Sequence, residues 1–275
     1  MLFLRRAALA GLLALAAVAP ANSQTKPRIV SLIPSLTEDL FAIGAGPQVV
    51  GVSAWTDFPP QATRLPVVGS ASSVDTELVL RLHPDAVVGI PAQAALVADL
   101  RRAGLSPELL ADDSYRDIFS DLARLGRISG HASEAAALEK RLRARTAQLQ
   151  GSVRGNSRPS VFIVLGVGPI YTVSDTSYIA QLIALAGGRN AAGNLKDAYP
   201  RYSAEALVAL QPDVVVADSQ SGLSGVLDRA PWNALRAVRE HRVYILADAA
   251  LLERPGPRYN EGLAWLIARL HPHGA

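Results

Sequence analysis

The sequence contains no cysteine, and this absence excludes several kinds of site. Without a thiol there can be no disulfide, no thiolate metal site and no lipid attachment through cysteine after removal of a leader. Neither sign of charge is in marked excess, because 27 Lys and Arg face 24 Asp and Glu, a formal charge of +3. Removal of Arg5 and Arg6 with a leader would leave +1. A protein with so little net positive charge does not attract the phosphates of nucleic acid strongly, and we expect no nucleic acid to bind.

Recognisable catalytic and metal-binding motifs are also missing. The five histidines form no group with ligand spacing, so we expect no bare metal-ion site and no cofactor; they are His83, His131, His241, His271 and His273. There is no phosphate-binding loop, and the segment 166–171 lacks the third glycine of a dinucleotide fingerprint. The segment 51–55 lacks the second glycine of a nucleophile elbow. We therefore do not expect an enzyme, and keep an exported enzyme without a recognisable motif as the alternative of another class.

The first 23 residues have the layout of a secretory signal peptide. Arg5 and Arg6 precede an apolar run over 7–19 that ends in small residues. This run is too short to span a membrane comfortably, and no later stretch reaches spanning length without charges. We expect a soluble, exported protein without a lipid anchor, and such a protein is best retained in a Gram-negative periplasm.

One phrase occurs twice, 128 positions apart. Residues 77–88 and 205–216 each contain Glu, a short apolar helix pattern, Pro-Asp and a β-branched run. Proline ends a helix because it lacks an N–H, and a Val-rich run suits a strand buried on both faces of a parallel sheet. The repeat therefore predicts an α/β fold of two similar lobes with mostly parallel sheets.

The pattern of apolar residues, glycines and prolines places the remaining elements. We expect Thr37 to cap a helix over 38–43 and Pro231 to begin another helix. The other expected helices are 92–103, 115–128, 177–186 and a last one ending at 270, and the expected strands are 28–33, 48–53, 105–110, 160–166 and 242–246.

A long helix is expected between the lobes, from about Ala132 to Val153. Its apolar residues Ala135, Leu138, Leu142 and Leu149 lie along one stripe, and its ~22 residues would span about 33 Å. Such a helix is a rigid connector. The expected organisation is a signal peptide at 1–23, an N-terminal lobe at 24–130, a connecting helix within 131–158 and a C-terminal lobe at 159–275.

The glutamates of the repeat occupy equivalent places. Asp75 and Ser203 are the expected N-caps, which puts Glu77 and Glu205 in the first turns of matching helices. A favourable interaction with the helix dipole is one explanation. The alternative is a spaced pair of negative contacts for a two-fold symmetric partner.

The ordered motifs resemble a known family over essentially the whole chain after the leader. The segment 28–32, the loop 57–60, both repeat copies and the intervening helix are similar to periplasmic binding proteins of the cobalamin, haem and iron-siderophore uptake ABC transporters. The resemblance implies two lobes joined by one rigid backbone helix, with a bulky metal chelate held in the cleft between them. It also implies a monomer whose Glu77 and Glu205 dock onto the two subunits of an inner-membrane permease.

Within that family the loop 52–60 looks most like the cobalamin binders, which carry an aromatic residue where Trp55 stands and another near Tyr199. These two are the expected walls of the cleft, although Trp55 as a core residue and Tyr199 as a packing residue are the alternatives. The ligand-binding residues implied are Ser35, Trp55, Asp57, Phe58, Ala71, Tyr171, Tyr199, Arg254 and Arg258. Arg258 could instead pair with Asp248 or Glu253. The sequence has Ala71 where the cobalamin binders often have Trp, and Ala250-Leu251-Leu252 where they have Asp and two aromatics.

Cobalamin is therefore the expected ligand, and haem and iron siderophores are the alternatives within the family. Haem needs an axial ligand, for which Tyr171 and Tyr199 are available. A catecholate siderophore would favour the charges of Arg201, Arg254 and Arg258.

Overall fold

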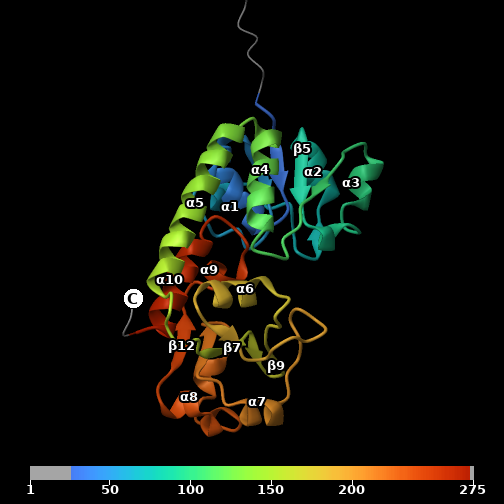
Figure 1. Ribbon diagram of the computed structural model, residues 1–275. Coiled ribbons are helices and arrows are strands. Elements are labelled where there is room, and N and C mark those ends of the chain that lie inside the picture. Colours follow the sequence, from blue (N-terminus) through green and yellow to red (C-terminus); the bar gives the residue numbers. More distant parts are fainter. Residues whose placement is uncertain (1–25, 273–275) are drawn as a thin grey trace, which may run out of the picture.

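The computed structural model describes residues 26–272 as two α/β lobes stacked along one long helix (Figure 1). The expected signal peptide at 1–23 lies outside the described residues. The strands are β1 (Ile29–Ser31), β2 (Val49–Val52), β3 (Gly69–Ser70), β4 (Ser73–Val74), β5 (Ala86–Gly89), β6 (Glu108–Leu109), β7 (Ser160–Val164), β8 (Gly166–Val167), β9 (Ile170–Tyr171), β10 (Arg189–Asn190), β11 (Val214–Asp218) and β12 (Val243–Leu246). The helices are α1 (Pro34–Ala42), α2 (Thr76–Arg81), α3 (Ala98–Arg102), α4 (Asp117–Ser129), α5 (Ala132–Ser152), α6 (Tyr178–Leu185), α7 (Ala204–Leu210), α8 (Arg236–Arg239), α9 (Ala250–Glu253) and α10 (Tyr259–Leu270).

Each lobe contains a four-stranded parallel sheet, and the two sheets have the same strand order. The order is β2-β1-β5-β6 in the first lobe and β10-β7-β11-β12 in the second. The central strands are runs of Val and Ile with almost no exposed surface, as parallel sheets covered on both faces require. The predicted fold class of two similar parallel α/β lobes is confirmed.

The Pro-Asp step of the repeat has the same structural role in both lobes. Asp85 accepts a hydrogen bond from the backbone N–H of Arg28 at 2.7 Å, and Asp213 accepts one from the N–H of Ser160 at 2.8 Å. Each carboxylate thus ties the turn after the repeat helix to the first strand of its lobe. The residues before the two prolines, His83 and Gln211, have left-handed φ values of 45° and 47°; Gln211 is the C-cap of α7, and His83 follows Leu82, the C-cap of α2.

Several expected boundaries are wrong. Helix α1 begins at Pro34, four residues before Glu38, because proline is well suited to a first helical position. Thr37 is not its cap: its buried hydroxyl donates to the backbone oxygen of Ile33, 3.2 Å away, and lies 2.9 Å from the Ser31 hydroxyl.

Three further elements are shorter than expected. The helix expected over 92–103 is a 3₁₀ turn followed by α3, since the Gln93 amide donates to the Leu32 carbonyl oxygen and fixes the tight turn. The strand expected over 105–110 is reduced to β6. Pro231 precedes a 3₁₀ turn, and α8 begins only at Arg236, whose N–H donates to the Gln211 side chain at 2.8 Å.

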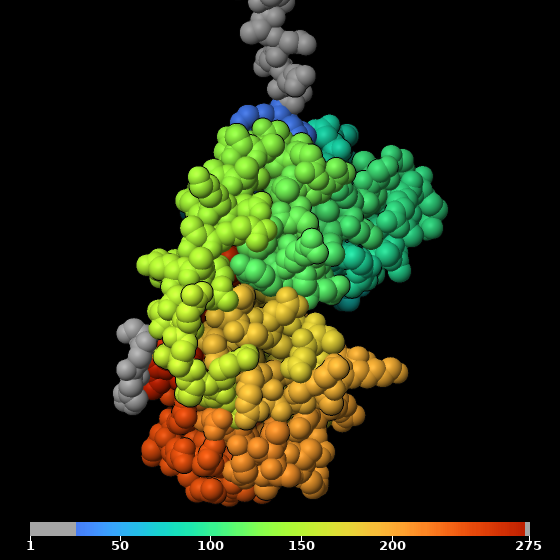
Figure 2. Space-filling model, viewed as in Figure 1, coloured from blue at the N-terminus to red at the C-terminus, as the bar shows by residue number. Residues whose placement is uncertain are grey.

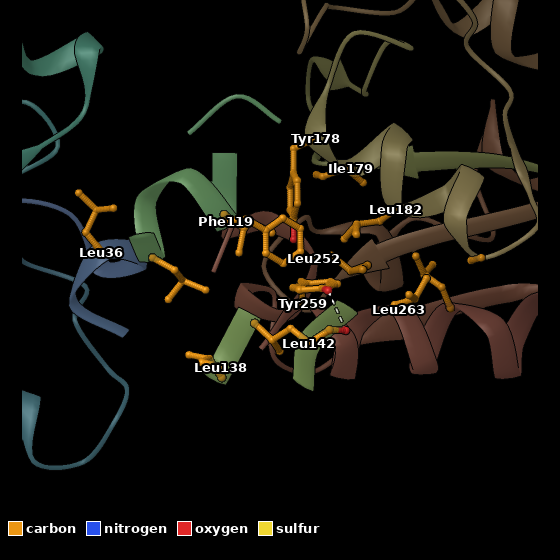
Figure 3. Close-up of a cluster of buried hydrophobic side chains, with 14 of the residues drawn as sticks. Leu36, Phe119, Leu138, Leu142, Tyr178, Ile179, Leu182, Leu252, Tyr259 and Leu263 are labelled. Carbon is orange, nitrogen blue, oxygen red and sulfur yellow. Dashed lines mark hydrogen bonds between the residues drawn. The ribbon is translucent and has the colours of Figure 1, made fainter. Parts of the chain in front are cut away.

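The long helix α5 runs beside both lobes, and its expected stripe faces the protein interior: Ala135, Leu138, Leu142 and Leu149 are all buried. The lobes also share a hydrophobic core around this helix. In Figure 3, Leu36 of α1 and Phe119 of α4 extend from one side of the cluster, and Tyr178 and Leu182 of α6 from the other.

A buried polar network reinforces this junction. The Tyr259 hydroxyl lies 2.6 Å from the Thr146 hydroxyl and 3.3 Å from that of Tyr115, and it donates to the Leu142 carbonyl oxygen at 3.2 Å. The Tyr115 N–H donates to Gln181 of α6 at 3.0 Å. The two lobes are therefore joined by packed side chains as well as by one helix. Among residues 26–272, no helix has the length and apolar character needed to cross a membrane.

Candidate ligand site between the lobes

A pocket of about 240 Å³ opens on the N-terminal lobe where its parallel strands end. Strand β1 is followed by Ser35, β2 by Ser53 and Trp55, and β6 by Asp112. Ligands in parallel α/β folds bind at the carboxyl ends of the strands. The pocket is completed by 253–255, which belong to the C-terminal lobe. We call it the upper pocket.

A second hollow, of about 480 Å³, lies on the C-terminal lobe and shares Glu253 with the upper pocket. Its walls include Tyr199, Gln220 and Asp218, the last residue of β11. We call it the lower pocket, and the two pockets together the cleft. Figure 2 shows the narrowing between the two lobes.

The cleft contains two exposed aromatic side chains. Trp55 is 78% exposed and Tyr199 is 49% exposed, so neither belongs to the core. Partial burial, followed by the negative charges of Asp112 and Asp113, raises the pKa of the Tyr199 hydroxyl. The cleft therefore offers apolar faces that a large planar ligand could cover.

The loop 52–60, which carries Trp55, is held by Arg254, 199 residues after Trp55 in the sequence. Arg254 donates to the Trp55 carbonyl oxygen at 3.0 Å and forms an ion pair with Asp57 with contacts of 2.5 and 3.3 Å. Partial burial opposes ionisation of Asp57, but the hydrogen bond and charge of Arg254 outweigh it and lower the pKa of this carboxyl. Trp55 itself has a φ of 66°, which is uncommon for a residue with a side chain. The contacts of Arg254 with Asp57 and with the Trp55 carbonyl oxygen, which we call the clamp, thus fix the loop in a conformation that it would not favour alone.

Glu38 of α1 binds both Arg254 and Arg258, and we call these three residues the Glu38 cluster. Its carboxylate is 3% exposed and accepts from Arg254 at 3.1 Å and from Arg258 at 2.8 and 3.2 Å. Arg258 also donates to Asp248 at 2.8 Å. Because Glu38 lies in the first lobe and both arginines follow α9, the cluster locks the C-terminal segment onto the N-terminal lobe.

Substitution of Glu38 by Gln is expected to lower the free energy of unfolding by about 3 kcal/mol, because two partly buried guanidinium groups would lose their shared carboxylate. Urea denaturation followed by circular dichroism measures this change. The matched control is Glu108→Gln, which breaks the more exposed pair with Arg124 and should cost at most about 1 kcal/mol. Equal effects of the two substitutions would contradict the locking role of Glu38.

The acids of the cleft hold their protons more tightly than usual. Burial, then the charge of Asp113, raises the pKa of Asp112 to about 6. The carboxyl of Glu253 lines both pockets, and burial between their walls, followed by the neighbouring Asp218, raises its pKa to about 8. Burial is the largest cause of both shifts, and the neighbouring acids Asp113 and Asp218 add to it.

The structure brings five of the nine expected ligand residues to the cleft: Ser35, Trp55, Ala71, Tyr199 and Arg254. Asp57 lines neither pocket and serves the clamp. Phe58 and Arg258 line a separate cavity of about 770 Å³ beside α1 and α5, where the guanidinium carbon of Arg258 lies 4.1 Å from the Phe58 ring centroid. Tyr171 bridges to Arg201 in an isolated β-pair and lines neither pocket. Of the alternative partners considered for Arg258, Asp248 is the one it pairs with.

The expectation did not include several residues that line the cleft. These are Ser53, Asp112, Asp218, Gln220 and Glu253. A signal was present for some of them, because Ser53 and Asp112 follow strands and Asp218 ends one, and polar residues at the carboxyl ends of parallel strands gather at one edge.

The equivalent glutamates lie on the outer helices of the two lobes. Asp75 accepts from the Leu78 N–H at 2.9 Å and Ser203 from the Ala206 N–H at 3.0 Å, so both expected N-caps are confirmed. Glu77 and Glu205 are exposed in the first turns, and neither forms an ion pair within residues 26–272. Over the same described range, no group of three His, Asp or Glu side chains is arranged to hold a metal ion.

Comparison with known proteins connects this geometry to a family. A family model described as periplasmic binding protein matches residues 29–250. A vitamin B12-binding protein of Vibrio cholerae is 30% identical over 234 residues, which cover 84% of each chain. The crystal structure of the periplasmic vitamin B12 binding protein of Vibrio cholerae has a TM-score of 0.81 at 28% identity and covers 90% of this chain and 97% of that one. A periplasmic heme-binding protein in complex with two hemes has a TM-score of 0.82 at 25% identity, with coverage of 90% and 98%.

Proposed function

Because this chain belongs to the periplasmic binding protein family, we propose that it is an exported receptor that captures a bulky metal chelate, cobalamin, and delivers it to an ABC importer of the inner membrane. The observation that carries the proposal is the cleft. Two pockets on different lobes share Glu253, and each contributes an exposed aromatic side chain, Trp55 or Tyr199. A corrin ring has large faces that such side chains can cover, and a polar rim for the surrounding hydroxyls and acids.

Capture, rather than chemistry, is the proposed mechanism. The aromatic side chains bury the faces of the ligand, and the polar residues of the loops orient its rim. The shared core, the Tyr259 network and the Glu38 cluster all connect the two lobes. We therefore propose only a small closure on binding, in contrast to receptors whose domains swing about a hinge.

Delivery to the importer would use α2 and α7, the helices that carry Glu77 and Glu205. Glu77 and Glu205 are exposed at equivalent places on the two lobes, and their fixed separation suits a permease built from two similar subunits. Docking would set the lobes against the two subunits, and the importer would then open the cleft to release the ligand. We also propose that the N-terminal lobe ends at residue 130 and that the C-terminal lobe begins at residue 159.

Haem is the second candidate ligand, and one observation favours it. The Tyr199 phenol is half-exposed in the cleft, and tyrosine is a known axial ligand of haem iron. None of the histidines in the described part of the chain lines either pocket.

The test is a titration of the purified protein with cyanocobalamin, haemin and a ferric catecholate siderophore, followed by calorimetry and visible spectra. We expect saturable binding of cyanocobalamin at one site, with a shift of its visible bands as the corrin leaves water. A new haem spectrum typical of phenolate ligation, with no heat from cyanocobalamin, would replace the proposal by the haem candidate.

A further inference from the structure

Two hydroxyl groups in the upper pocket have no hydrogen-bond partner among the described residues. Ser35 is 3% exposed and Ser53 is 2% exposed, and the Oγ atom of each is buried and unpaired. Both residues line the pocket. A buried hydroxyl left unpaired costs about 1–3 kcal/mol, so each would be stabilised by a polar ligand group that comes within hydrogen-bond distance of it. A hydroxyl can donate to an oxygen and accept from an N–H, which suits a neutral ligand group with both.

The charged groups around these hydroxyls are mostly acids. Asp112 and Glu253 line the pocket, and Asp113 and Asp218 are near enough to raise their pKa values. Arg254 also borders the pocket, but its guanidinium is engaged by Glu38, Asp57 and the Trp55 carbonyl oxygen. A negative ligand group would therefore meet acids and no unengaged cation.

A carboxamide and a carboxylate differ in charge and in their ability to donate a hydrogen bond. The carboxamide is uncharged, its NH₂ can donate to the carboxylates of Asp112 and Glu253, and its oxygen can accept from a serine hydroxyl. A carboxylate of the same shape only accepts, and its charge would add to those of the nearby acids.

On the basis of the proposed function, we propose that the upper pocket is a subsite for neutral carboxamide groups on the rim of the ligand, in which Ser35 and Ser53 form hydrogen bonds to the amide and Asp112 and Glu253 disfavour carboxylates. This subsite would allow the receptor to distinguish an amide-rimmed corrinoid from tetrapyrroles and siderophores that carry carboxylates or other anions.

The test compares cyanocobalamin with its isolated monocarboxylic acids, in each of which one peripheral carboxamide has been hydrolysed. Binding is measured by calorimetry at pH 8. We expect cyanocobalamin to bind the wild type at least about 10-fold more tightly than one of the monoacids, because a 10-fold ratio requires only about 1.4 kcal/mol of unfavourable charge interaction. In the double variant Asp112→Asn/Glu253→Gln this ratio should fall below about 3-fold, because the monoacid no longer meets the two acids and the Asn and Gln amides can donate hydrogen bonds to its carboxylate.

Two further variants complete the design. Ser35→Ala/Ser53→Ala should weaken cyanocobalamin binding, whereas Asp228→Asn/Glu240→Gln, a matched loss of two exposed acids that line neither pocket, should change nothing. Equal affinity for cyanocobalamin and all its monoacids, or an unchanged ratio in the Asp112/Glu253 variant, would overturn the subsite and leave the proposed function standing. Failure of cyanocobalamin to bind at all would overturn both.

Discussion

Reversal of both Glu77 and Glu205 to Arg is expected to abolish uptake and to leave ligand affinity unchanged. Both glutamates are exposed on helices that line neither pocket of the cleft, so their loss should not reach a bound ligand. Each reversal places a positive charge where the proposed permease surface is positive, and like charges across an interface cost several kcal/mol. The measurements are uptake of labelled cyanocobalamin by cells with the cognate importer, and calorimetry on the purified variant.

Glu261→Arg is the matched control for this experiment. Glu261 is also an exposed acid in the first turn of a helix, α10, but it lies outside the repeat. All three reversals should reduce stability by a similar amount, about 0.5–1 kcal/mol each, through the helix dipole. Only the pair at 77 and 205 should stop uptake. Reduced ligand affinity in the Glu77/Glu205 variant would instead assign these residues to ligand binding and contradict the docking role.

Substitution of Trp55 by Ala is expected to weaken cyanocobalamin binding by about 2–3 kcal/mol, roughly 30- to 150-fold, because the ligand would no longer cover the indole face. The free energy of unfolding should change by no more than about 0.5 kcal/mol, since the side chain is 78% exposed and makes little contact with the core. Alanine is the appropriate replacement because it keeps the unfavourable φ of 66° that glycine would relieve. Calorimetry and urea denaturation measure the two quantities.

Two comparisons make this result specific. Trp55→Phe keeps an aromatic face and should recover much of the affinity. Ile245→Ala removes another exposed apolar side chain, 36% exposed on β12 and outside both pockets, and should leave affinity unchanged. Full affinity in a folded Trp55→Ala variant would show that the indole is not a wall of the site, and strong destabilisation would favour a core role.

Much of the fold could be predicted from the sequence, because the repeat indicates a helix, a turn and a strand in each lobe. Two copies of a helix, a Pro-Asp turn and a Val-rich strand were sufficient to predict two parallel lobes, and the buried stripe of α5 followed from its spacing. The shared core was not accessible. Tyr115 and Tyr259 are 144 residues apart, and no local pattern indicates that their hydroxyls lie 3.3 Å from each other.

Some of the residues expected at the site line the cleft, and their role in binding stays a prediction. Trp55 and Tyr199 lie in the cleft, as the family resemblance implied. Both arginines were expected to contact the ligand: Arg254 borders the upper pocket and also holds the Trp55 loop, whereas Arg258 lines another cavity with Glu38 and Phe58. Glu38 looks in sequence like an ordinary helix residue, and its contacts with residues 216 and 220 positions away depend on tertiary structure alone. Glu253 was missed for the same reason, whereas Asp112 could have been found from its place after a strand.

The continuous packing around α5 has a consequence for the transport cycle. With the small closure proposed above, a receptor whose lobes share one core would present nearly the same outer surface whether it is empty or full. The membrane complex would then have no shape change by which to refuse an unloaded molecule. Surplus empty receptor should therefore occupy the importer and slow transport as a competitive inhibitor, to an extent set by the ratio of empty to filled molecules.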